Sequence, residues 1–173
     1  MEIFDEVNKI IEDYFRPYGE IHVTCALEFW YCHDDKELAW SFLSNEFSDN
    51  LFDDFFENEL GCPVVNNFIY SLFHEFGHFM TQAQFNHDDW DKYYRVRDTI
   101  ENSIEDRKER ELAYFHLDQE IAASRWAAEH IRNHYDEIIS WSDNVLGPAI
   151  GRAFQNSSDL QELVNCLEAE EDV

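Results

Sequence analysis

Residues 64–80 read VVNNFIYSLFHEFGHFM and form the most informative stretch of the chain. Apolar side chains recur through it every three or four residues, which is the spacing of one helix face. These positions are Val65, Phe68, Ile69, Leu72, Phe76, Phe79, Met80 and Ala83. Pro63 suits the first turn of a helix, where a missing N–H costs little. The pattern therefore predicts a buried helix from Pro63 to about Gln84.

The second half of this helix contains the motif HExxH, as HEFGH at residues 74–78. His74 and His78 are four residues apart and face the same side, so both rings can bind one metal ion. Glu75 follows the first histidine and is placed to act on a water molecule at that metal. Gly77 costs the helix roughly 1 kcal/mol relative to alanine. A glycine here would let another backbone or a substrate come close.

A catalytic zinc usually has three protein ligands and an open position for water, so a third ligand is expected from another helix. Our first candidate is Glu120, in the segment YFHLDQEIAASRWA at residues 114–127. Small side chains follow it on one face: Ala123, Ser124 and Ala127. They would let this helix pack closely against the helix of Gly77, so that a carboxylate can reach the metal. The second choices for the third ligand are His116, Asp118 and His87.

HEFGH followed by Glu120-x-x-Ala123-x-x-Trp126-Ala127 resembles the gluzincin form of the zincin-like metallopeptidases. Within that group the chain looks most like small intracellular proteins of phages and mobile elements, and more loosely like the ImmA/IrrE-type peptidases. The resemblance covers residues 64–130 well. Residues 45–60 and 140–173 match no part of the pattern.

The resemblance implies that His74, His78 and Glu120 bind Zn²⁺ and that Glu75 is the general base. Zinc lowers the pKa of its water and polarises a carbonyl oxygen, while Glu75 takes the water proton and returns it to the leaving amine. The implied activity is peptide-bond hydrolysis on a protein or basic peptide substrate. The residue that stabilises the oxyanion stays open among Tyr93, Tyr94, Tyr114, His116 and His87.

The charge balance limits the kinds of molecule that this protein is expected to bind. Against 38 Asp and Glu the chain has 12 Lys and Arg, for a formal net charge of -26. Direct nucleic-acid binding is not expected, because affinity for phosphates needs Lys and Arg. No Lys or Arg lies between Lys36 and Lys92. This favours either a solvated acidic surface with one mixed-charge helix, or an acidic rim that attracts cations and basic peptides.

The same charge supports an alternative function from another class. The chain could be an acidic phage-type inhibitor, or a binding protein that imitates a nucleic acid, with a structural or vestigial zinc site. Regulatory cleavage of one specific repressor is a third hypothesis, and it rests on the ImmA/IrrE resemblance alone.

The chain start lacks the features of a signal peptide, and no apolar run is long enough to span a membrane. The four cysteines, Cys25, Cys32, Cys62 and Cys166, form no CxxC pair. We therefore expect reduced thiols in a cytoplasm, the host cytoplasm if the protein is phage-encoded. Two lesser metal sites are considered: Cys25 with Cys32, and His130 with His134 and Glu137.

A chain of 173 residues with 15 Phe, 8 Tyr and 5 Trp suits a single domain with one core. The expected fold is α+β and mainly α-helical: one zincin-like domain over residues 1–173. A small antiparallel sheet, built from residues 21–27, 29–32 and 38–43, is expected beside the HExxH helix, with a turn at residues 33–35.

Further helices are expected before and after the sheet and the HExxH segment in the sequence. The N-terminal helix covers residues 2–16, and residues 45–60 form a short acidic helix or loop that ends at Gly61. Residues 88–113 form one long helix, and a further helix runs from about Gln119 to Ile139 with Asp118 as its cap. Near the C-terminus, Pro148 begins a helix, and Ser157 or Ser158 caps the last one.

Overall fold

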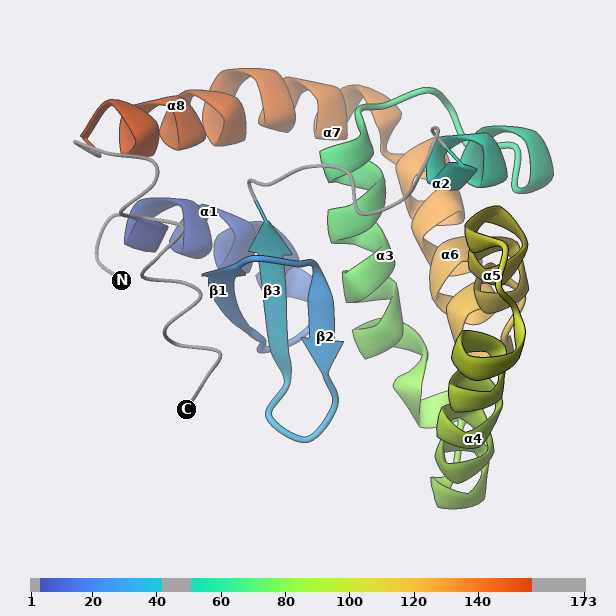
Figure 1. The fold of residues 1–173 in the computed structure, drawn as a ribbon. Helices are drawn as coiled ribbons and strands as arrows, with labels where there is room; N and C mark the ends of the chain where they lie inside the picture. The colour runs from blue at the N-terminus through green and yellow to red at the C-terminus, as the bar shows by residue number, and fades with distance from the viewer. Residues whose placement is uncertain (1–3, 42–50, 157–173) are drawn as a thin grey trace. The chain divides into compact units, whose positions relative to one another are not determined.

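The structure, a computed structural model, describes residues 4–41 and 51–156 (Figure 1). It is mainly helical with a small sheet, which confirms the α+β fold class. The chain divides into two compact units: Met1–Ser44 with Tyr135–Val173, and Asn45–His134. The single zincin-like domain over residues 1–173 stays a prediction. Ser157 and Ser158 lie outside the described residues.

The first unit combines the two ends of the chain. Helix α1 (Asp5–Phe15) is followed by a 3₁₀ turn, η2 (Arg16–Tyr18), which ends at Gly19. Towards the C-terminus come α7 (Tyr135–Trp141), a π-helical turn η6 (Ser142–Leu146) and α8 (Gly147–Asn156). Pro148 stands in the first turn of α8, as predicted. The Nε1 of the buried Trp40 donates to Asn8 Oδ1 at 2.7 Å and ties α1 to the sheet.

The sheet of this unit is mixed, so the prediction of an antiparallel sheet is wrong in one pairing. Its strands β1 (His22–Ala26), β2 (Trp30–Cys32) and β3 (Glu37–Ser41) lie in the order β1-β3-β2. The predicted turn joins β2 to β3 as an antiparallel pair, but β1 pairs with β3 in parallel. The central strand, β3, is also the most buried of the three. The expected place of the sheet beside the HExxH helix stays a prediction.

The second unit contains the HExxH helix and is built from helices alone in the residues described. It comprises α2 (Leu51–Asp54), a π-helical turn η4 (Phe55–Glu59), α3 (Asn67–Thr81), a 3₁₀ turn η5 (Gln82–Gln84), α4 (His87–Ser103), α5 (Arg107–Phe115) and α6 (Asp118–Asn133). Figure 1 shows α3 and α6 side by side along much of their length. Gly61, with φ 63°, follows η4 where the segment was expected to end.

Three helix boundaries differ from the predictions, and side-chain capping explains two of them. Asn66 accepts a hydrogen bond from the Ile69 N–H at 2.9 Å, so α3 begins after it and Pro63 stays outside the helix. Asp106 accepts from the Glu109 N–H at 2.9 Å, which starts α5 and divides the predicted helix 88–113. The predicted helix 119–139 likewise divides at His134, and Asp118 is the first residue of α6 rather than its cap.

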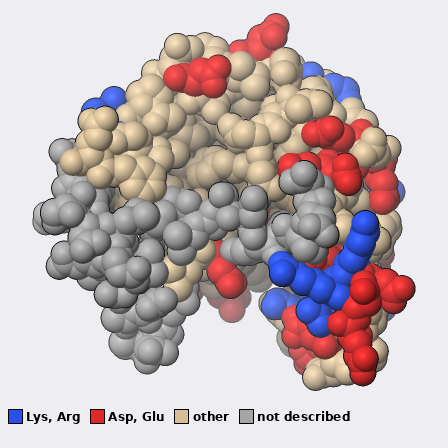
Figure 2. All heavy atoms as spheres, turned by 45° about the horizontal axis from the view of Figure 1, so that its top comes forward, with Lys and Arg blue, Asp and Glu red and all other residues tan. Residues whose placement is uncertain are grey.

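Basic side chains gather over α4 and α5, where acidic side chains stand among them (Figure 2). Arg97 pairs with Glu101 at 3.0 Å and Arg107 with Glu111 at 2.7 Å, each one helical turn apart. These pairs give the helices the mixed-charge character predicted from the sequence. Within the described residues, no helix combines the length and the apolar character that crossing a membrane requires.

Candidate metal centre

The centre is built on an unusually close approach of α3 and α6. A Cβ added at Gly77 would lie 2.4 Å from the carbonyl oxygen of Ala123 and 3.0 Å from its Cα. No side chain fits at this distance, so only glycine allows the contact. Ala123, Ser124 and Ala127 are all buried on the facing side of α6. The small-residue face predicted from the sequence is therefore confirmed as a helix–helix contact.

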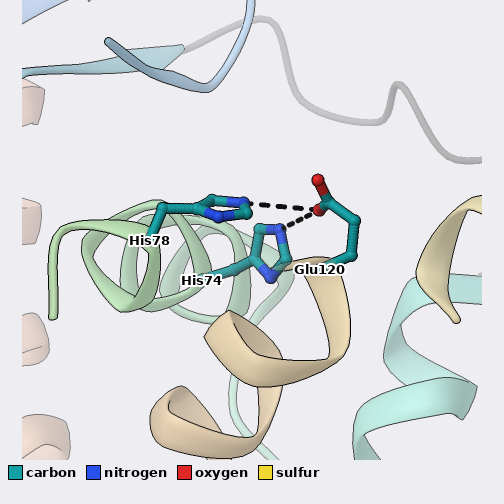
Figure 3. A group of neighbouring side chains, drawn as sticks. All are labelled: His74, His78 and Glu120. Carbon is teal, nitrogen blue, oxygen red and sulfur yellow. Dashed lines mark hydrogen bonds and ion pairs between the residues drawn. The ribbon is translucent and has the colours of Figure 1, made fainter. Parts of the chain in front are cut away.

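This contact brings the three predicted metal ligands together. His74 and His78 project from one side of α3, and Glu120 points towards both from the first turn of α6 (Figure 3). The Glu120 Oε2 lies 3.0 Å from His74 Nε2 and 3.3 Å from His78 Nε2. All three potential donor atoms lie within 4.8 Å of one another. The group could hold one metal ion.

Two of the three potential ligands are buried, and their surroundings fix the ring of His74. Glu120 is 1% exposed and His74 5% exposed. The second ring nitrogen of His74, Nδ1, and Ser124 Oγ share a hydrogen bond of 2.9 Å. The ring of Phe52 meets the His74 ring edge-on, with centroids 5.4 Å apart. The imidazole is therefore held from both sides while its Nε2 faces Glu120.

The pKa values of this group are strongly coupled. Burial lowers the pKa of His78, but the charge and hydrogen bond of Glu120 outweigh burial, and the pKa of His78 rises to about 9. Burial raises the pKa of Glu120, but the two histidines outweigh it and hold that pKa well below its ordinary value. Since a metal ligand must be deprotonated, a metal and a proton compete for His78 at neutral pH.

Glu75, the predicted general base, is half-buried beside this group on α3. Burial raises the pKa of its carboxyl, as does the charge of Glu120, while His74 and His78 lower it. The net effect is a raised pKa. A carboxylate whose pKa is shifted towards neutrality is a better proton acceptor in catalysis at neutral pH than an ordinary one.

The second choices for the third ligand lie outside the centre. His116 is exposed and bonds the Leu112 carbonyl oxygen and Glu59. Asp118 lies 3.8 Å from Lys92, and His87 lies 3.8 Å from Asp91. Each of these three side chains therefore has a partner away from His74 and His78.

Neither of the two lesser sites predicted from the sequence gathers three potential metal ligands among the described residues. His130 is stacked between Trp126 and His134, with ring centroids 4.8 and 4.6 Å away. Cys25 and Cys32 are free thiols. Among the described residues, neither set belongs to a group of three or more potential metal ligands.

Two hydrogen-bonding residues of the centre were not predicted in those roles. The sequence distinguishes Ser124 only by its small size, although it stands one turn after Glu120 and can face the same partner helix. Tyr93 was one of five candidates for an oxyanion-stabilising group, and the structure shows its hydroxyl donating to Glu120 Oε1 at 2.6 Å. Tyr114 lies next to it, whereas Tyr94 is 53% exposed.

Replacing Ser124 with alanine is expected to weaken metal binding about 10-fold, because His74 would lose the hydrogen bond that orients its ring. A competition titration with a chromophoric chelator would measure the change. Ser71→Ala is the matched control, since Ser71 is a buried serine on α3 that bonds Asn67 instead. Equal metal affinity in both variants would contradict an orienting role for Ser124.

Comparisons with known proteins found no relative of this chain. No protein-family model, curated protein or solved structure gives a significant match to the chain.

Proposed function

We propose that this protein is a zinc-dependent peptidase that hydrolyses peptide bonds in a protein or basic peptide. The observation that carries the proposal is the convergence of His74, His78 and Glu120 on one point, with Glu75 next to the first ligand in an HExxH motif. Two imidazole nitrogens and one carboxylate oxygen are the donor set of a common class of catalytic zinc site. We further propose that the protein acts in a cytoplasm.

Two of the three donor separations support the proposal of a zinc ion. Donors about 2.0–2.2 Å from a tetrahedral zinc ion lie roughly 3.3–3.5 Å from one another. The two separations from Glu120 Oε2 are 3.0 and 3.3 Å, so small side-chain shifts would accommodate the ion. With three protein donors, a bound zinc ion would keep a position open for water, as catalytic rather than structural zinc sites do.

A zinc ion held by His74, His78 and Glu120 would supply a water molecule of lowered pKa and a Lewis acid for the scissile carbonyl. Glu75 would accept a proton from the attacking water and later deliver it to the leaving amine. Its raised pKa suits both steps, because the carboxyl then holds a proton more readily than an ordinary glutamate does. The net charge of -26 would favour encounter with basic peptides.

Replacing Glu75 with glutamine tests this function. We expect metal content to stay unchanged and cleavage of a basic peptide library, followed by mass spectrometry, to slow by about 10²–10⁴-fold. Glu129→Gln is the control, because it makes the same charge change at an exposed position of α6. Unchanged turnover in Glu75→Gln would remove Glu75 from the mechanism. No cleavage by the zinc-loaded protein would refute the proposed hydrolysis.

The net charge favours a second candidate, an acidic protein that binds a basic partner in place of nucleic acid. In that case the metal would be structural or vestigial, and Glu75→Gln would keep the full biological effect. Competition with DNA for a basic protein, measured at several salt concentrations, tests this candidate. Binding no stronger than that of a neutral control protein would exclude it.

A further inference from the structure

Helix α4 contributes one buried side chain to the fold, that of Tyr93. The helix has 17 residues, and Tyr93, at 7% exposed, is its single buried residue. The next residue, Tyr94, is 53% exposed. A phenol in such a position carries a hydroxyl that needs a hydrogen-bond partner. The partner in this structure is a candidate metal ligand.

The two carboxylate oxygens of Glu120 have different partners, and the hydroxyl of Tyr93 is the partner of one of them. It donates to Oε1 at 2.6 Å, which is short and typical of a hydrogen bond to an ionised carboxylate. The other oxygen, Oε2, faces His74 Nε2 and His78 Nε2. Rotation of the carboxylate would break the Tyr93 bond and move Oε2 away from the histidines. The phenol therefore fixes the plane of the carboxylate, so that one oxygen faces the two histidines.

Tyr114 supports Tyr93 from α5, with its hydroxyl 3.3 Å from that of Tyr93. A phenol is protonated at neutral pH, so Tyr93 can serve as the donor to Glu120.

The first turn of α6 also binds the backbone of α4, close to Tyr93 in the sequence. Gln119, buried next to Glu120, donates through Nε2 to the carbonyl oxygen of Asp89 at 2.9 Å. Lys92 lies 3.8 Å from Asp118. Three consecutive residues at the start of α6 therefore each have a partner on α4. The position of the Tyr93 ring relative to Glu120 is fixed by these flanking contacts as well as by its own bond.

We propose that Tyr93, supported by Tyr114, is a positioning residue that holds Glu120 in the orientation required to bind the metal through Oε2. This role rests on the proposed metal centre. Second-layer partners of metal ligands typically contribute about 10–100-fold in metal affinity or activity. Loss of the Tyr93 hydroxyl should fall within that range, and loss of the more distant Tyr114 hydroxyl should cost less.

The test compares Tyr93→Phe, Tyr114→Phe and the matched control Tyr94→Phe. Zinc affinity is measured by chelator competition, and the visible spectrum of the Co²⁺-loaded protein reports on ligand geometry. We expect Tyr93→Phe to weaken zinc binding by about 10–100-fold and to change the cobalt spectrum. Tyr114→Phe should change both in the same direction by less, and Tyr94→Phe should match the wild type.

The outcomes separate this inference from the proposed function. If the wild type binds zinc and Tyr93→Phe binds it equally well with an unaltered cobalt spectrum, the positioning role is wrong while the metal centre stands. A lower Tm of Tyr93→Phe without those changes would show only a structural role and would also overturn it. If Tyr93→Phe does not fold, a wild-type affinity and spectrum in Tyr114→Phe overturns the proposal. No zinc or cobalt binding by the wild type would remove both the centre and this role.

Discussion

Replacing Gly77 with alanine is expected to lower the free energy of unfolding by about 1–3 kcal/mol, the usual cost of overpacking a core. The added Cβ would lie 2.4 Å from a backbone oxygen of α6, which cannot move aside as a flexible side chain could. The gain in helix propensity, roughly 1 kcal/mol, offsets part of the strain. Urea unfolding followed by circular dichroism would measure the net effect.

Gly151→Ala is the matched control for this prediction. Gly151 also lies within a helix, α8, but an added Cβ there would meet no atom within 4 Å. Its replacement should stabilise the protein by up to roughly 1 kcal/mol, because only the helix-propensity term acts. If Gly77→Ala were as stable as Gly151→Ala, the close contact of α3 with α6 would be wrong, and the position of Glu120 would lose its basis.

Replacing Glu120 with glutamine is expected to weaken zinc binding by more than about 100-fold. Structural zinc sites with four ligands bind with roughly 10–16 kcal/mol, so one ligand accounts for about 3 kcal/mol or more. Glutamine keeps the size of the side chain but removes the negative charge that faces His74 and His78. Chelator competition on the metal-stripped protein would measure the change.

The control for this variant is again Glu129→Gln, which lies on the same helix as Glu120 but is exposed. It alters the net charge by the same amount, so it separates loss of a ligand from a general electrostatic effect. A zinc affinity in Glu120→Gln equal to that of Glu129→Gln would mean that Glu120 is not the third ligand.

The centre could be predicted in part because its signals are local. The HExxH spacing placed two histidines on one helix face, and Gly77 together with the small residues after Glu120 indicated which helix would pack there. Tyr93 could not be singled out, since its contact with Glu120 joins two helices and no spacing rule connects them. The orienting bond of Ser124 depends on the same close packing.

The fold was predicted less well where side-chain capping sets a helix boundary or where the order of the strands sets their pairing. Apolar spacing continues across Asp106, but the side chain of Asp106 caps α5 and divides the predicted helix. Residues 42–43 of the third predicted strand lie outside the described residues. Within the described residues the strand segments were predicted correctly, whereas the parallel pairing of β1 with β3 depends on which strand is central. Propensity alone does not specify that order, because it describes each strand separately.

The central claim is that His74, His78 and Glu120 bind one metal ion. Its most direct test is metal analysis by inductively coupled plasma mass spectrometry, on wild-type protein and a His74→Ala/His78→Ala variant, each purified without added zinc. We expect close to one zinc per chain in the wild type and almost none in the variant. Metal-free wild-type protein that also fails to bind zinc when titrated, or equal metal content in both proteins, would contradict it.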